Sequence, residues 1–196
     1  MNAVNLREGD ELVEALLTNG SEQVLIAARD GRCCRFEETD ARPMGRNSTG
    51  VRGINIEDTD EVIGAINYDP GAEDAVAHTV LVVSENGFGK RTDFDEYRIT
   101  NRGGKGVKTI NITEKTGKLI AIKNVTENDD LMIIEKSGLT IRMAVSDIRV
   151  AGRATQGVKL INIKDGDSIA AVSTVEKSNE DEQDKVSDET SEVPQE

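Results

Sequence analysis

The sequence is poor in the residues that most often carry metal binding, disulfide bonding or membrane insertion. It has no tryptophan, one histidine and two cysteines among 196 residues. His78 has no second histidine or cysteine beside it, so no metal site is expected. Cys33 and Cys34 are adjacent and would point to opposite faces of a strand, which argues against a disulfide framework and favours a reducing, cytoplasmic compartment. No apolar run reaches the length of a membrane span, and no signal-peptide pattern opens the chain.

Catalytic patterns are also missing. No serine, cysteine or tyrosine stands in a recognisable nucleophile–base arrangement, and no GxxxxGK[ST] loop is present. We therefore expect a protein that is not an enzyme by itself, with no catalytic residue and no cofactor of its own.

Negative charge is abundant but unevenly distributed. The formal net charge is −13. Residues 176–196 hold nine acids against Lys177 and Lys185, a net charge of −7, so the remainder carries −6. This block has no aromatic residue and few apolar ones, and it cannot offset its ordering entropy by burial. It is predicted to be a disordered acidic tail.

A repeat of about fifty residues organises the rest of the chain. One seven-residue pattern recurs three times, as Gly50-Val51-Arg52-Gly53-Ile54-Asn55-Ile56, Gly106-Val107-Lys108-Thr109-Ile110-Asn111-Ile112 and Gly157-Val158-Lys159-Leu160-Ile161-Asn162-Ile163. Short β-branched stretches and turn glycines predict four short strands in each unit. The predicted fold is all-β, a partial array of propeller-like, four-stranded antiparallel blades. Its predicted divisions are the second half of a preceding blade (1–20), three blades (21–70, 71–126 and 127–175) and the tail (176–196).

Basic residues recur at fixed places in this repeat. Counted from the turn glycines Gly31, Gly87 and Gly138, arginine stands four, eleven and fifteen positions on in every unit. Arginine is rarely buried without a partner, and no acid keeps step with it. A repeated charge on a repeated scaffold indicates contacts to a repeating anionic polymer, double-stranded DNA. The predicted contacts are Arg35, Arg42, Arg46, Arg52, Arg91, Arg98, Arg102, Lys105, Lys108, Arg142, Arg149, Arg153 and Lys159. Ion pairs inside each blade are the alternative.

With its repeats aligned, the chain resembles the C-terminal, DNA-wrapping domain of bacterial DNA gyrase A. The segments that carry the resemblance are Arg42–Arg46 with Gly50–Ile54, Ile148–Arg153 with Gly157–Lys159, and Arg102–Gly106. The last matches the final five positions of the family's Q-R-R-G-G-K-G heptapeptide.

The resemblance implies a β-pinwheel of six blades whose basic rim bends DNA, of which this chain would hold the C-terminal half. It also implies partners, namely the rest of gyrase A together with gyrase B in an A2B2 assembly. ATP and magnesium would act in domains or partner proteins outside this chain. The equivalent domain of topoisomerase IV, or a propeller that binds proteins, are the alternative functions.

The acidic block makes a prediction of its own. Tethered beside a basic rim, it would compete with DNA phosphates at high local concentration. Truncation after Val175 should tighten DNA binding most at low ionic strength, because the attraction between exposed charges is screened by salt. Equal DNA affinity of the truncated and full chains at low salt, in a fluorescence anisotropy titration, would contradict this.

Overall fold

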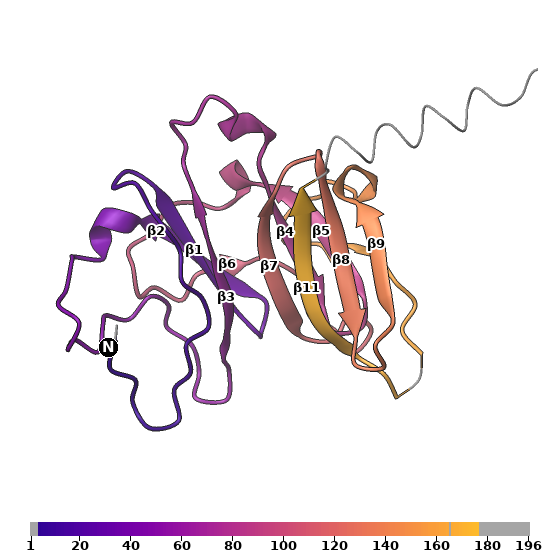
Figure 1. Cartoon of the computed structure of the whole chain (residues 1–196), viewed down its shortest axis with the longest axis horizontal. Helices are drawn as coiled ribbons and strands as arrows, with labels where there is room; N and C mark the ends of the chain where they lie inside the picture. Colours follow the sequence, from indigo (N-terminus) through magenta and orange to yellow (C-terminus); the bar gives the residue numbers. More distant parts are fainter. Residues whose placement is uncertain (1–3, 165, 177–196) are drawn as a thin grey trace, which may run out of the picture.

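The computed structural model describes residues 4–164 and 166–176, which form antiparallel sheets joined by loops and short 3-10 turns. No α-helix occurs in this part of the chain. Figure 1 shows the sheets following one another in sequence order, with β1–β3 on the left and β8, β9 and β11 on the right. The predicted all-β, propeller-like fold is confirmed.

The first sheet has the strand order β3-β1-β2-β6. Its hairpin turns at Asp30-Gly31 and pairs Leu25 with Arg35 across the two strands. The strands are β1 (Gln23–Ala28), β2 (Arg32–Glu37), β3 (Val62–Tyr68) and β6 (Val107–Lys108).

The second sheet repeats this order as β7-β4-β5-β10, and the third contains β11-β8-β9. The strands of the second sheet are β4 (Thr79–Ser84), β5 (Phe88–Asp93), β7 (Leu119–Val125) and β10 (Val158–Lys159). Those of the third are β8 (Asp129–Glu135), β9 (Thr140–Ala144) and β11 (Ile169–Glu176). A 3-10 turn follows β2, β5 and β9, at η1 (Glu38–Asp40), η3 (Phe94–Glu96) and η4 (Val145–Asp147), while η2 (Ala75–Ala77) precedes β4.

Neighbouring repeats exchange a strand, so a sheet is not the same as a repeat unit. β6 comes from the second repeat but pairs with β2 of the first, and β10 comes from the third repeat but pairs with β5 of the second. The four strands predicted in each unit are present in the second and third repeats, where β6 and β10 span only two residues each. In the first repeat, residues 51–56 form no strand, so the prediction was wrong there.

The apolar core runs across the junctions between sheets. One cluster joins Leu25 of β1 to Val80 and Val82 of β4, and another joins Leu81 of β4 to Leu131 of β8. Each blade therefore buries its apolar face against its neighbour. Cys33 and Cys34 lie in different clusters, on opposite faces of β2 as expected.

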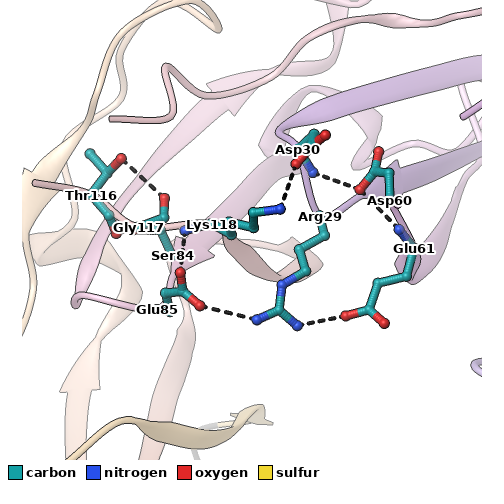
Figure 2. Close-up of polar contacts among 9 residues, drawn as sticks. All are labelled: Arg29, Asp30, Asp60, Glu61, Ser84, Glu85, Thr116, Gly117 and Lys118. Carbon is teal, nitrogen blue, oxygen red and sulfur yellow. Dashed lines mark hydrogen bonds and ion pairs between the residues drawn. The ribbon is translucent and has the colours of Figure 1, made fainter. Parts of the chain in front are cut away.

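Charged residues bind the first two blades together near their hairpin turns (Figure 2). The Arg29 guanidinium bridges Glu61 Oε1 at 2.5 Å and Glu85 Oε1 at 3.1 Å, and Lys118 Nζ lies 3.1 Å from Asp30 Oδ1. A second oxygen of Glu85 accepts the Lys118 backbone N–H at 2.6 Å. These side chains are partly exposed, so the cluster fixes orientation more than it adds stability.

The N-terminal end of the described chain differs from the sequence prediction. Residues 4–20, predicted to be half of a preceding blade, are exposed and form no strand, and a strand needs neighbours to be stable. The predicted acidic tail lies outside the described residues from position 177 onward.

Strand exchange depends on glycine at the start of each exchanged segment. Gly106 has φ 68°, and a Cβ there would lie 2.5 Å from the Cys33 carbonyl oxygen. Gly50, its equivalent in the first repeat, has φ 81° but no atom within 4 Å of a Cβ.

This difference allows a matched test of the exchange. Gly106→Ala should lower the free energy of unfolding by roughly 2–4 kcal/mol, because it adds a clash to the cost of the backbone conformation. Gly50→Ala should lower it by only about 1–2 kcal/mol, the backbone term alone. Urea denaturation monitored by circular dichroism measures both, and equal losses would show that the close packing of Gly106 is not strained by a methyl group.

Candidate nucleic-acid interface

The candidate interface is built from three equivalent loops, residues 41–50, 97–106 and 148–157. Each begins after a 3-10 turn, η1, η3 or η4, and ends at the glycine of the repeated segment. The second and third loops lie on the outer strand of the preceding blade. Backbone hydrogen bonds fix this position, from Thr100 N to Arg35 O at 2.8 Å and from Ala151 N to Arg91 O at 2.9 Å.

The arginine eleven positions after each turn glycine is exposed in every repeat. Arg42, Arg98 and Arg149 each stand two residues beyond the end of a 3-10 turn. Their common place on a common scaffold gives the surface three equally positioned guanidinium groups. This arrangement suits phosphates, which the planar guanidinium group can bind through two parallel hydrogen bonds.

The arginines four positions after the turn glycine are not at the surface in the first two repeats. Arg35 is 6% exposed and Arg91 is 4% exposed. Arg35 donates to the carbonyl oxygens of Phe94 at 2.5 Å and Tyr97 at 2.9 Å, and to Gln23 Oε1. Arg91 donates to the carbonyl oxygen of Ile148 at 2.7 Å.

These contacts correct the sequence prediction that Arg35 and Arg91 face DNA. Both guanidinium groups bond the backbone at the 3-10 turn of the following repeat, and burial lowers the pKa of Arg35. The absence of an acid in step with the arginine did not reveal this burial, because Arg35 bonds Gln23 and two backbone carbonyls, and Arg91 bonds one carbonyl and forms an ion pair with Glu127 at 3.1 Å. We call Arg35 and Arg91 the arginine latches.

Arg142, the third member of this set, differs from the other two. Its side chain is 44% exposed, and its Nε donates to Asp130 Oδ2 at 2.7 Å. No 3-10 turn of a following repeat covers it among the described residues.

The arginines fifteen positions after the turn glycine bind backwards, to the preceding repeat. Arg102 donates to Asp40 O at 2.9 Å and to Arg52 O at 2.6 Å, and Arg153 donates to Lys108 O at 2.9 Å. Both are half-buried, so part of each guanidinium still reaches solvent. These contacts hold the second and third loops on the preceding repeat.

The remaining predicted residues are exposed. Arg46 and Lys105 lie in the loops, and Lys159 lies over the Phe88 ring with its Nζ 5.9 Å from the centroid. Arg52 and Lys108 each donate to an asparagine three residues on, Asn55 at 3.1 Å and Asn111 at 3.3 Å. The asparagines of the repeated segment therefore orient surface bases.

Lys90 is a functional candidate that the sequence reasoning missed. It is fully buried in β5, and its Nζ donates to the carbonyl oxygens of Gly152 and Arg153 at 2.6 Å each, and to both oxygens of Thr155. Burial lowers the pKa of Lys90 to about 8. The aligned repeats contained a signal for Lys90, because it stands where the first and third repeats have the apolar residues Cys34 and Ile141.

The described residues offer little else of chemical interest. They contain no group of three or more histidine, cysteine or acidic side chains that could hold a metal ion. Nor do they contain a helix long and apolar enough to cross a membrane.

Blades that exchange strands and repeat an exposed arginine after each 3-10 turn define a propeller-like repeat module. The chain belongs to the family described as DNA gyrase C-terminal domain, beta-propeller, whose model matches residues 22–68, 78–126 and 129–176. The three matches begin at or just before β1, β4 and β8.

Curated relatives agree with this family. The chain is 44% identical over 198 residues to the DNA gyrase A protein of Staphylococcus aureus (strain MRSA252), covering 99% of this chain and 22% of the relative. The same protein of strain NCTC 8325 / PS 47 is 44% identical over 191 residues, covering 97% of this chain and 21% of the relative. The chain thus spans about a fifth of the length of these relatives.

Two solved structures share the fold. The structure of a DNA gyrase A C-terminal domain has a TM-score of 0.78 at 23% identity and covers 88% of this chain and 57% of its own. The C-terminal domain of DNA topoisomerase IV has a TM-score of 0.82 at 19% identity. The match covers 95% of this chain and 57% of the topoisomerase IV chain.

The Lys90 contacts can be tested through stability. Lys90→Met should lower the free energy of unfolding by on the order of 2–3 kcal/mol, because it leaves buried carbonyl oxygens without a charged donor. The folded pKa of about 8 lies below the unfolded 10.5, so the folded chain binds fewer protons between these values. The stability advantage over Lys90→Met should therefore grow as pH rises from 8 to 10.5.

Thermal melts of both proteins across that pH range measure the difference. Lys105→Met, at an exposed loop position, is the matched control and should leave the melting temperature unchanged. A pH-independent difference between the parent chain and Lys90→Met would contradict the lowered pKa.

Proposed function

We propose that this chain is a non-catalytic module that binds and bends double-stranded DNA as part of gyrase A. The observation that carries the proposal is the set of exposed arginines Arg42, Arg98 and Arg149, at one structural position in three consecutive blades of a gyrase-family domain. DNA passing from blade to blade would meet the same guanidinium group each time. Contacts to phosphate rather than to bases would make this binding largely independent of sequence.

The proposed contact surface is narrower than the sequence prediction. It consists of the exposed bases of the loops and repeated segments, namely Arg42, Arg46, Arg52, Arg98, Lys105, Lys108, Arg149 and Lys159. The arginine latches, Arg102, Arg153 and Lys90 support this surface by holding each loop on its neighbour. Arg142 lies on β9, where it pairs with Asp130, and is left out of this surface.

Two other functions compete with this one. A topoisomerase IV domain would have the same fold, but the 44% identity to gyrase A over nearly the whole chain favours gyrase. A propeller that binds proteins would use apolar surface, whereas the equivalent positions of the three loops carry arginine.

The whole assembly follows from the same proposal. The partners would be the rest of gyrase A together with gyrase B, in an A2B2 complex in the cytoplasm. ATP- and magnesium-dependent chemistry would belong to domains outside this chain, and the chain would contribute bent DNA to it.

Ligation of nicked circular DNA in the presence of the chain tests bending directly. The linking number of the closed product should shift as the ratio of protein to DNA rises. Binding without any shift would limit the function to DNA binding, and absence of binding at low salt would overturn the proposal.

The contact residues can be tested by salt dependence. Replacing Arg42, Arg98 and Arg149 by alanine should weaken binding to unrelated DNA sequences alike. It should flatten the slope of log K against log salt by about 2.7, or 0.9 per phosphate contact.

Fluorescence anisotropy at several salt concentrations gives this slope. Lys118→Ala, which removes a cation at the hairpin ends shown in Figure 2, is the control and should change the slope little. An unchanged slope in a folded triple variant would rule out these arginines as phosphate contacts.

A further inference from the structure

A surface pocket of about 660 Å³ lies where the second blade meets the repeated segment of the third repeat. One side comes from the second repeat, with Asn86 in its hairpin turn and Lys115 in the loop between β6 and β7. The other side comes from the third repeat, with Lys159 on β10 and Lys164 beyond it. Phe88, which is only 6% exposed, completes the pocket.

Three lysines concentrate positive charge in this pocket. The Nζ atoms of Lys115 and Lys159 lie 5.3 and 5.9 Å from the centroid of the same Phe88 ring, and Lys164 also lines the pocket. All three residues are exposed, and none forms an ion pair with an acid among the described residues. Like charges gathered in one pocket repel each other, and a bound anion would relieve that repulsion.

The acid in the described lining is engaged elsewhere. Asp167 Oδ1 accepts the backbone N–H groups of Ser137 at 3.3 Å and Ser168 at 2.8 Å. Hydrogen bonds from Ser137 and Ser168 hold the pKa of Asp167 below its ordinary value. Its charge is therefore used by the backbone of the third repeat, and the three lysines keep the pocket positive.

The equivalent place in the first junction lacks this positive charge. Where the second repeat has Lys115, the first has the segment 57–61, which contains four acids and no base. Two bases remain there, Arg32 and Lys108, but they donate to a backbone carbonyl oxygen and to an asparagine side chain. The lysine pocket is thus a feature of the second junction alone and not of the repeat.

The pocket lies on the same outer edge as the third loop. Lys159 pairs with Phe88, and Val150 lies beside Arg91, three residues further along β5. At about 3.3 Å per residue, the pocket and the loop that carries Arg149 are roughly 10 Å apart along the strand. The grooves of B-DNA are about 6 and 12 Å wide, so these two places can hold phosphates on either side of one groove.

We propose that Lys115, Lys159 and Lys164 together bind a backbone phosphate of double-stranded DNA in this pocket. The inference rests on the proposed function and adds to it a contact that the repeated arginines do not supply. Lysine is a compact charge on a flexible stem, so three of them can close on one phosphate without the fixed geometry that guanidinium groups require. The second junction would therefore hold the duplex more tightly than the first.

Acylation of lysine amines, followed by mass spectrometry with and without DNA, tests the pocket residue by residue. Bound phosphate should slow the modification of Lys115 and Lys164. Lys118, in the same loop as Lys115 and with a side chain 45% exposed, is the matched control and should react equally in both cases. Inorganic phosphate at the same phosphate concentration should protect little, and protection equal to that by DNA would overturn the assignment to DNA.

Salt dependence of DNA binding gives a second measurement. The double variant Lys115→Ala/Lys164→Ala should flatten the slope of log K against log salt by about 0.9, the value for one phosphate contact. Lys115→Ala alone should weaken binding at low salt, whereas Lys118→Ala removes the same charge and should not. Circular dichroism establishes that each variant is folded.

The outcomes separate this inference from the proposed function. A parent chain that does not bind DNA at low salt would overturn both. If the parent binds DNA, unprotected Lys115 and Lys164 or an unchanged slope in the double variant would overturn the pocket alone.

Discussion

Main-chain pairing between consecutive repeats is the interaction on which the rest of this structure depends. A blade is completed only when the next repeat adds β6 or β10 to its outer edge. This addition brings the following loop onto the preceding blade, where its backbone hydrogen bonds to Arg35 or Arg91. The positions of Arg98 and Arg149, in the second and third loops, are therefore set by strand exchange rather than by the loops themselves.

Basic residues in this fold divide into supporting and exposed groups. Arg35 and Arg91 bind forward to the next repeat, and Arg102 and Arg153 bind backward to the preceding one. Lys90 in β5 also binds forward, to carbonyl oxygens of the loop at residues 148–157. Buried cations of this kind stay favourable only because several carbonyl oxygens replace their water. Arg42, Arg98 and Arg149 are exposed, and the loops of Arg98 and Arg149 are held in place by these contacts.

The amino-acid sequence by itself determined the all-β fold class, the hairpins, the repeat length and the gyrase family. Glycine turns, β-branched stretches and seven-residue patterns are local features, and local preferences decide such elements. Only the tertiary structure decided that β6 and β10 belong to the preceding sheet, because pairing across repeats leaves no local mark. It also decided that Arg35 and Arg91 are buried while Arg42, Arg98 and Arg149 are exposed. All five are arginines at fixed intervals, and what separates them is whether backbone carbonyls of a neighbouring repeat surround the guanidinium group.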